Sequence, residues 1–308
     1  MSESTPGPMS GHLGEPLLEV EHVVMQFGGV TAVNDANFTV HPGTVTGLIG
    51  PNGAGKTTCF NIISGLQRPT KGTVRFRGRT VTSTPVHRRS KRGMGRTFQR
   101  LEAFGSLTVR ENVMVARDLH RGVLGSLRPM RGGRAQVDAL LERVGIASHA
   151  DERADSIPTG AARLLELARC LAGDPKLLLL DEPSSGLDET ETDDFGDLLR
   201  ELASEGRSIL MVEHDMDLVM GVCDTIHVLD FGSIIASGDP AMIRNDPRVQ
   251  QAYLGYSDES AESAESAESA AAEADVEQTR TDLAPVGAPV GAHDQTMTIP
   301  AVGTEEQR

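Results

Sequence analysis

The sequence has few cysteines and no long apolar segment. Cys59, Cys170 and Cys223 have neither the number nor the spacing of a disulfide framework or a zinc site, which indicates reduced, structural thiols in a cytoplasmic protein. The first residues contain no basic segment followed by an apolar run, so a secretory signal is not expected. Apolar runs such as Leu177–Leu180 are far shorter than the roughly 20 residues of a membrane-spanning helix, so a partner subunit would have to cross any membrane.

Basic charge is scarce as well. The 308 residues carry a formal net charge of −15, and residues 256–308 alone carry −10, which leaves −5 for the other 255 residues. No basic surface suited to nucleic acid is therefore expected, and an acidic tail would repel phosphate backbones and anionic lipids. The charge pattern argues against nucleic acid as a partner.

The composition changes twice along the chain. Residues 1–16 are polar and rich in Gly, Pro and Ser, which predicts a disordered lead-in. Residues 17–256 contain the apolar patterns of one folded domain. Residues 257–308 repeat Ser-Ala-Glu and contain no aromatic residue, which predicts an acidic, low-complexity, disordered tail. Solvated disorder without a specific function is favoured for this tail, and a regulatory or partner-binding role is the alternative.

Two kinds of strand pattern are present. Alternation in LLEVEHVVMQF, NFTV and TVRFRG predicts half-buried strands in the first third of the chain. The runs VTGLIG, KLLLLDE and SILMVEH are almost continuously apolar, as is typical of strands buried on both faces of a parallel sheet. A ligand is expected beyond the carboxyl ends of these runs, where GPNGAGKTT, DEP and EH follow. Residues of about 101–172 lack strand patterns and are predicted to form a helical insert.

The stretch GPNGAGKT, residues 50–57, matches the phosphate-binding pattern G-x-x-x-x-G-K-[ST] between a predicted strand and a predicted helix. Glycines let successive N–H groups surround the phosphates, Lys56 reaches the β and γ oxygens, and the Thr57 hydroxyl can ligate Mg²⁺. A glycine-rich turn without function is the alternative. The residues expected to bind nucleotide here are Gly50, Pro51, Asn52, Gly53, Ala54, Gly55, Lys56, Thr57 and Thr58.

Five other positions carry chemistry that fits this loop. Asp181 ends an apolar run and can hold the Mg²⁺ shell, and Glu182 is placed to polarise an attacking water, although adjacent carboxylates can also mark a solvated turn. His214 ends another run and can hydrogen-bond the γ-phosphate; a structural histidine is the alternative. Gln99 can reach metal or water. Phe27 is a candidate platform for adenine, or else a core aromatic.

In this order, Phe27, the loop at 50–57, Gln99, the stretch DEPSSGLD and His214 resemble the nucleotide-binding subunits of ABC transporters over about residues 17–256. The resemblance implies an α/β P-loop NTPase cassette with a mostly parallel core sheet, an N-terminal antiparallel β subdomain and a helical insert. It also implies ATP with Mg²⁺, held between the P-loop of one subunit and the signature motif of a second. Asp188 would cross that interface.

Two longer stretches narrow the resemblance. MGRTFQRLEAFGSLTVRENVMVA and IRNDPRVQQAYLG are similar to the LivG-type ATPase subunits of branched-chain amino acid importers, and urea and amide importers use closely similar subunits. Partners implied by this family are a second, different ABC ATPase, two membrane permease subunits and an external substrate-binding protein. The chain would be a peripheral subunit at the cytoplasmic face of the membrane.

The signature position departs from the family. Alignment on LELAR places Ile157, Pro158, Thr159, Gly160 and Ala161 where the family has Leu-Ser-Gly-Gly-Gln. Pro158 lacks a hydroxyl and an N–H, and a missing donor of this kind typically costs about 100-fold to 1000-fold in rate in other enzymes. Because a signature serves the nucleotide of the opposite subunit, a weakened ATP site is expected in the partner.

The helix after this segment is predicted to begin with a cap. Thr159 is expected to cap it. A polar face is expected at Arg163, Glu166 and Arg169, opposite an apolar stripe. The stripe consists of Leu164, Leu167, Ala168 and Leu171.

Three other functions remain to be weighed against an importer ATPase. A nucleotide-binding regulatory subunit with little hydrolysis is disfavoured by the presence of both Glu182 and His214. A soluble ABC ATPase of translation or DNA repair generally has two cassettes or a long coiled coil, and here there is one P-loop and no sustained heptad pattern. A GTPase is disfavoured because no Asn-Lys-x-Asp motif is present.

Overall fold

The computed structural model describes residues 14–97, 102–126 and 133–254. Its strands are β1 (Leu18–Phe27), β2 (Val30–Val40), β3 (Val45–Ile49), β4 (Lys71–Phe76), β5 (Arg79–Thr80), β6 (Met94–Arg96), β7 (Leu177–Asp181), β8 (Ser208–Val212), β9 (Thr225–Asp230) and β10 (Ser233–Gly238). Its helices are α1 (Lys56–Ser64), α2 (Val86–Lys91), α3 (Val109–Ser126), α4 (Gly133–Arg143), the 3-10 helix η1 (Ala147–His149), α5 (Thr159–Leu171), α6 (Glu189–Ser204), α7 (Met216–Val222), α8 (Pro240–Arg244) and α9 (Pro247–Leu254).

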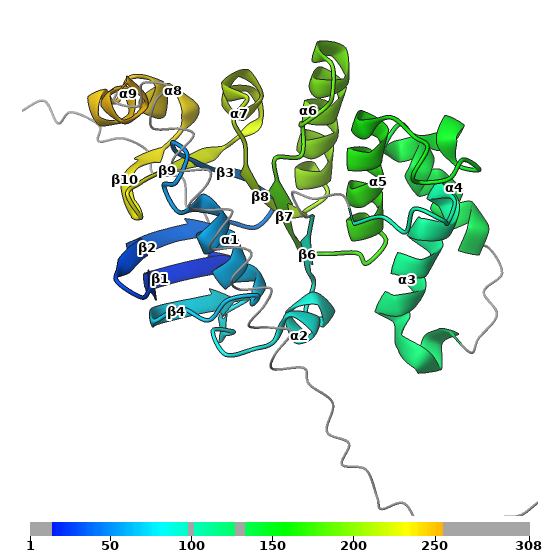
Figure 1. The fold of residues 1–308 in the computed structure, drawn as a ribbon, viewed down its shortest axis with the longest axis horizontal. Coiled ribbons are helices and arrows are strands. Elements are labelled where there is room, and N and C mark those ends of the chain that lie inside the picture. Colours follow the sequence, from blue (N-terminus) through cyan, green and yellow to red (C-terminus); the bar gives the residue numbers. More distant parts are fainter. Residues whose placement is uncertain (1–13, 98–101, 127–132, 255–308) are drawn as a thin grey trace, which may run out of the picture. The chain divides into compact units, whose positions relative to one another are not determined.

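The larger sheet has the strand order β10-β9-β3-β8-β7-β6, and its strands are parallel except β10, which is antiparallel to β9 (Figure 1). Every residue of β3, β7 and β8 is buried. This burial explains their continuous apolar runs, because both faces of each strand are covered. The predicted parallel core sheet is confirmed.

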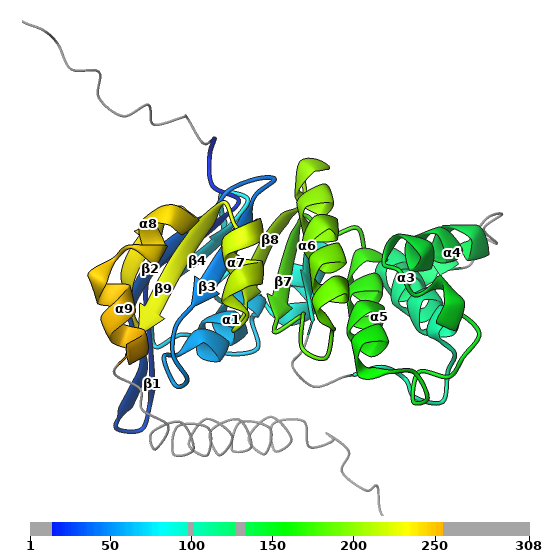
Figure 2. The same cartoon turned by 90° about the horizontal axis from the view of Figure 1, so that it is seen from above.

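Side chains of the central strands alternate between two apolar cores. Leu178 and Leu180 of β7 pack with α5, α6 and α7 on one face, and Leu177 and Leu179 pack with α1 and the N-terminal sheet on the other. Figure 2 shows α6 and α7 along the first of these faces. The sheet is thus held from both sides, and the loops at its strand ends have a rigid base.

The smaller sheet is antiparallel, with the order β2-β1-β4-β5. Its inward residues, such as Val20, Phe38 and Val74, are buried against α1. Outward residues alternate with them, as the sequence pattern predicts. The expected N-terminal antiparallel β subdomain is confirmed.

Helices α3, α4 and α5 gather beside the β6 edge of the larger sheet (Figure 1). Asn112 is fully buried at the base of α3, where its side chain accepts a hydrogen bond from the N–H of Phe104 and donates to the carbonyls of Phe104 and Thr108. No strand lies between α3 and α5 in the described part of this region. Among the described helices, none has the length and apolar composition needed to span a bilayer.

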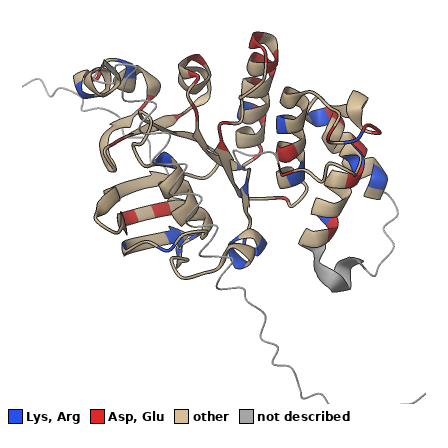
Figure 3. Ribbon diagram, viewed as in Figure 1, with Lys and Arg blue, Asp and Glu red and all other residues tan. Residues whose placement is uncertain are grey.

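Charge is distributed unevenly over the fold. No Asp or Glu occurs between Asp35 and Glu102, so all charged side chains of β4, β5 and α2 are basic (Figure 3). One of them, Arg89, is 1% exposed and donates to the carbonyls of Ile62 and Ile63 at the end of α1. Burial lowers the pKa of Arg89 to about 10. This guanidinium joins α2 to the C-terminal end of α1.

The three thiols are unpaired, as predicted. Burial raises the pKa of Cys59, Cys170 and Cys223 to about 12 in each case. The Cys170 Sγ lies 2.9 Å from the carbonyl oxygen of Arg96, to which the thiol donates. All three side chains therefore remain protonated and structural at neutral pH.

Candidate active site

The P-loop, residues 50–57, connects β3 to α1. Gly50, Gly53 and Gly55 have φ angles of 154°, 74° and 100°, in the region that favours glycine. Lys56 begins α1 and is 7% exposed, and its Nζ donates to the carbonyl oxygens of Gly50 (2.8 Å) and Pro51 (2.9 Å). The ammonium is therefore held over the loop that is predicted to bind phosphate.

A Cβ at Gly55 would be both strained and crowded. The position has φ 100°, and a Cβ built on it would lie 2.4 Å from the carbonyl oxygen of Ala32 in β2. We expect Gly55→Ala to lower the free energy of unfolding by about 2 kcal/mol, because the left-handed conformation alone costs about 1–2 kcal/mol for a residue with a Cβ. Chemical denaturation of the full chain measures this loss.

Gly29 provides the matched control, because a Cβ there would meet no atom within 4 Å and its φ is not left-handed. The free energy of unfolding of Gly29→Ala is expected to lie within about 0.5 kcal/mol of the wild-type value. Equal stability of the Gly55→Ala and Gly29→Ala proteins would contradict the prediction.

Segments from the C-terminal third also contact the P-loop. The N–H of Gly232 donates to the carbonyl oxygen of Ala54 (3.0 Å). Burial raises the pKa of Tyr253 in α9 to about 12, and a hydrogen bond with the backbone of Gly50 opposes this rise. Tyr253 was not among the predicted site residues, since no local pattern connects it to Gly50.

Asp181, at the end of β7, is 3% exposed. Its Oδ2 lies 3.3 Å from Nη2 of Arg96, whose Nη1 donates to Asn61 Oδ1 and Ser64 Oγ, both 2.8 Å away on α1. Burial lowers the pKa of Arg96, and Asp181 opposes this shift. Arg96 thus links the predicted metal-shell carboxylate to the helix that follows the P-loop, and it is a site residue that the sequence prediction missed.

Glu182 and His214 are in direct contact. His214 Nε2 lies 2.8 Å from Glu182 Oε1, and the two residues follow the adjacent strands β7 and β8. Glu182 has φ 48°, which is uncommon for a residue with a side chain. Its N–H donates to the Val212 carbonyl oxygen (2.9 Å), so pairing with β8 continues through this residue. The predicted contact of His214 with a γ-phosphate stays a prediction.

The signature segment, residues 157–161, leads into α5. A Cβ on Gly160 would lie 3.0 Å from the Gly186 carbonyl oxygen, so the segment packs against the loop between β7 and α6. Thr159 is not the cap, contrary to the prediction: the helix begins at Thr159, and Pro158 holds the N-cap position without a side-chain hydrogen bond. Pro158 has φ −58° and ψ 155°, values that the proline ring permits just before a helix.

Glu166 lies beside Arg163 on the predicted polar side of α5, but this side is buried. It is 4% exposed, because the segment at Glu102 covers this side of α5, and its Oε1 accepts the N–H of Glu102 (2.9 Å). Arg163 lies 3.5 Å from its Oε2. Burial raises the pKa of Glu166, and the hydrogen bond from Glu102 opposes this rise.

This shift predicts a pH-dependent effect of Glu166→Gln. Because the folded carboxyl binds a proton more readily than the unfolded one, its contribution to stability is lost as pH rises from the unfolded pKa through the raised folded pKa. We expect the free energy of unfolding of Glu166→Gln, relative to wild type, to increase across that window. Denaturation of both proteins at pH 4.5 and pH 7 measures the difference between their free energies of unfolding. A difference that does not change with pH would contradict the prediction.

The remaining predicted positions have mixed outcomes. Asp188 is the N-cap of α6, where its side chain accepts the Glu191 N–H (2.8 Å); it is exposed, and its role across an interface stays a prediction. Phe27 ends β1 and is half-buried, opposite Val30. Gln99 lies outside the described residues. Thr57 and Thr58 are half-buried in the first turn of α1.

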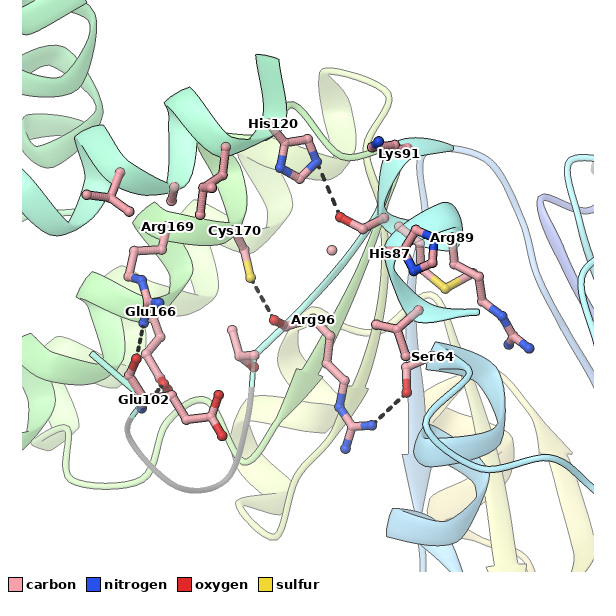
Figure 4. Close-up of a pocket in the computed structure, with 18 of the residues that line it drawn as sticks. Ser64, His87, Arg89, Lys91, Arg96, Glu102, His120, Glu166, Arg169 and Cys170 are labelled. Carbon is pink, nitrogen blue, oxygen red and sulfur yellow. Dashed lines mark hydrogen bonds between the residues drawn. The ribbon is translucent and has the colours of Figure 1, made fainter. Parts of the chain in front are cut away.

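A groove of about 430 Å³ lies between α2, β6, α3 and α5 (Figure 4). Phe104 and Leu119 on its wall are 47% and 72% exposed. Thr97 and Glu102, on either side of the segment with Gln99, also line it. Its other polar lining residues are Ser64, His87, Arg89, Ser90, Lys91, Arg96, His120, Glu166 and Arg169.

Known proteins match this fold and this order of motifs. Residues 33–185 match the family described as ABC transporter. The chain is 42% identical over 253 residues to the high-affinity branched-chain amino acid transport ATP-binding protein LivG of Escherichia coli (strain K12), covering 79% of this chain and 99% of LivG. The chain belongs to the ATP-binding proteins of ABC transporters, a family of ATPases that bind nucleotide.

Finer comparisons agree with the LivG resemblance. Residues 233–259 match the family described as branched-chain amino acid ATP-binding cassette transporter. Over 253 residues the chain is 40% identical to the branched-chain amino acid transport ATP-binding protein BraF of Pseudomonas aeruginosa, covering 79% of this chain and 99% of BraF. The ADP conformation of MJ1267, an ATP-binding cassette of an ABC transporter, matches with a TM-score of 0.71 and 29% identity, covering 79% of this chain and all of that chain. The predicted LivG-type family is confirmed.

Proposed function

We propose that the chain is the ATP-hydrolysing subunit of an importer for branched-chain amino acids, working at the cytoplasmic face of a membrane. The observation that carries the proposal is the contact between Glu182 and His214, 2.8 Å long, just beyond the ends of the adjacent strands β7 and β8, of which β8 pairs with the strand that leads into the P-loop. The names of LivG and BraF support the choice of substrate.

In the proposed reaction, Lys56 and the P-loop amides bind the β- and γ-phosphates of ATP. Glu182 accepts a proton from water as the water oxygen bonds to the γ-phosphorus. The bond from that phosphorus to the β–γ bridging oxygen breaks, giving ADP and inorganic phosphate. His214 holds the Glu182 carboxylate in place through its Nε2. It is also the residue that hydrogen-bonds the γ-phosphate in this proposal.

The residues present fit a magnesium ion that arrives with ATP. Mg²⁺ is usually bound by one or two carboxylates together with phosphate oxygens and waters. Among the described residues no group of three or more His, Cys, Asp or Glu could enclose a metal, and Asp181 offers one buried carboxylate instead. Thr57 and Asp181 would hold the ion, with Gln99 as a third ligand, and the ion would neutralise charge on the phosphates.

We assign the groove to a membrane permease subunit. Its exposed Phe104 and Leu119 offer apolar contact, and the side of its rim formed by α2 is basic because α2 carries no acidic residue. The exposed Glu102 lies elsewhere on the groove. An occupant with apolar and acidic side chains fits this wall best. Arg96 lines the groove and also binds Asp181, so binding of the permease in the groove would change the position of the Asp181 carboxylate through Arg96.

The signature segment makes the transporter asymmetric in this proposal. Pro158 and Ala161 would weaken the ATP site whose P-loop belongs to the second ATPase subunit. The site built on the P-loop of this chain has Lys56, Asp181 and Glu182. Hydrolysis would therefore occur mainly at the site built on the P-loop of this chain, provided that the partner carries a complete signature.

Uptake by a reconstituted transporter tests the function. The chain, its second ATPase and two permeases would be placed in lipid vesicles with the external binding protein, and labelled leucine, valine, urea and an amide would be offered separately. ATP-dependent accumulation of leucine and valine is expected. Accumulation of urea or the amide alone would move the chain to the alternative substrates, and no ATP-dependent accumulation of any of the four would refute the importer function.

A further inference from the structure

Glu213 is a buried carboxylate directly after β8. It is 4% exposed, and each of its oxygens accepts one backbone N–H. Oε1 accepts the N–H of Ser184 at 2.8 Å, and Oε2 accepts the N–H of His214 at 2.9 Å. A buried carboxylate is costly unless such partners satisfy it, so its retention here calls for a reason.

The two amides belong to the two segments that carry Glu182 and His214. Ser184 lies two residues after Glu182, and His214 is the next residue in the chain after Glu213. With the His214–Glu182 contact of 2.8 Å, these bonds close a ring that runs from Glu182 through Ser184, Glu213 and His214 back to Glu182. A shift of either segment would break at least one bond of the ring.

The backbone at Glu182 needs such support. Its φ of 48° is a conformation that costs about 1–3 kcal/mol for a residue with a side chain and persists only where surrounding contacts impose it. The Glu182 N–H is held by Val212, on the strand that immediately precedes Glu213. Glu213 holds the same loop two residues further on, at Ser184.

We propose that Glu213 is a positioning residue that fixes the Glu182 carboxylate and the His214 imidazole relative to each other for ATP hydrolysis. The inference rests on the proposed function of this site. Glu213 touches neither phosphate nor water in this role. It acts through the two loop backbones, and ATP binding at the P-loop on β3 does not depend on it.

Glu213→Gln and Glu213→Ala remove this support in steps. Glutamine keeps one acceptor oxygen and turns an NH₂ donor toward the other N–H, whereas alanine leaves both amides without their acceptor. We expect kcat for ATP in the assembled transporter to fall about 10-fold for glutamine and about 100-fold for alanine, since a misplacement of about 1 Å can cost about 100-fold. The KM for ATP is expected to change by less than about 3-fold.

Ser208→Ala is the matched control. Ser208 is fully buried at the opposite end of β8, and its Oγ accepts the N–H of Gly43 at 2.9 Å. This variant also removes a buried bond between a side chain and a backbone N–H, so it destabilises the same strand. We expect it to lower the melting temperature while kcat stays at the wild-type value.

A double variant separates positioning from general stability. If Glu213 acts through His214 and Glu182, then adding Glu213→Ala to His214→Ala lowers kcat by much less than Glu213→Ala does alone. Wild-type kcat in Glu213→Ala, full additivity with His214→Ala, or an equal loss of kcat in Ser208→Ala would each overturn the inference. When Glu182→Gln abolishes turnover and Glu213→Ala does not, the inference alone fails; when Glu182→Gln retains turnover, the proposed function fails with it.

Discussion

Turnover of ATP by the assembled transporter is expected to fall about 100-fold to 10,000-fold when Glu182 is replaced by glutamine, the range that general-base catalysis typically supplies. The amide cannot accept a proton from water, yet it preserves the size of the side chain and can still meet His214, whose Nε2 is 2.8 Å from the present carboxylate. ATP affinity should therefore change little. Steady-state phosphate release and equilibrium binding of labelled ATP measure the two quantities separately.

Glu189→Gln is the control for this substitution. Glu189 is an exposed carboxylate in the first turn of α6, on the same loop-to-helix segment, so the charge change is matched without touching the site. Its turnover should equal that of wild type. The corresponding Glu→Gln change in the second ATPase subunit should lower ATP turnover less than Glu182→Gln does, if hydrolysis occurs mainly at the site built on the P-loop of this chain. Equal losses of turnover from the two changes, at sites that act independently, would count against this asymmetry of hydrolysis.

Replacement of Lys56 by alanine is expected to weaken ATP binding by about 10-fold to 100-fold, since a hydrogen bond to a charged group contributes about 1.5–3 kcal/mol. The Nζ is positioned by the carbonyls of Gly50 and Pro51, so the ammonium is already oriented over the loop. Lys56→Ala should also lower ATP turnover, because the same ammonium balances charge on the γ-phosphate. Titration with a fluorescent ATP analogue checks the affinity.

Lys71→Ala removes an exposed lysine at the start of β4 and should leave ATP affinity unchanged. Circular dichroism of the Lys56→Ala protein establishes that the domain is folded before its affinity is interpreted. Wild-type affinity in a folded Lys56→Ala protein would show that the P-loop does not bind the phosphates in the proposed way.

The parts of the site that could be predicted are those specified by short, continuous stretches of the sequence. β3, β7 and β8 were predicted because burial on both faces requires continuous apolar residues, and the polar residues that follow each run then meet at one edge of the sheet. Local composition and the rules of parallel sheets were sufficient for these strands and their shared edge. The contact between Glu182 and His214 was not predicted, because it requires β7 and β8 to be neighbours and no local pattern specifies the strand order.

The residues that the sequence did not predict depend on contacts between distant segments. Arg96 binds Asp181 across 85 positions of the chain, and Glu213 binds Ser184 across 29. Helical periodicity predicted the polar side of α5 but not the burial of Glu166, because it describes one helix alone and Glu102, 64 positions away, covers that side. Such pairings arise from the packing of whole elements, and no local pattern specifies them.

The protonated thiols make this protein suited to site-specific labelling. Maleimides react with thiolates, and Cys59, Cys170 and Cys223 have pKa values of about 12, so almost none of each is ionised at pH 7. A cysteine introduced at an exposed position such as Glu189, with an ordinary pKa, would react far faster than any of the three. Fluorophores on two cysteines introduced in this way could then report distances during the transport cycle with the native cysteines left in place.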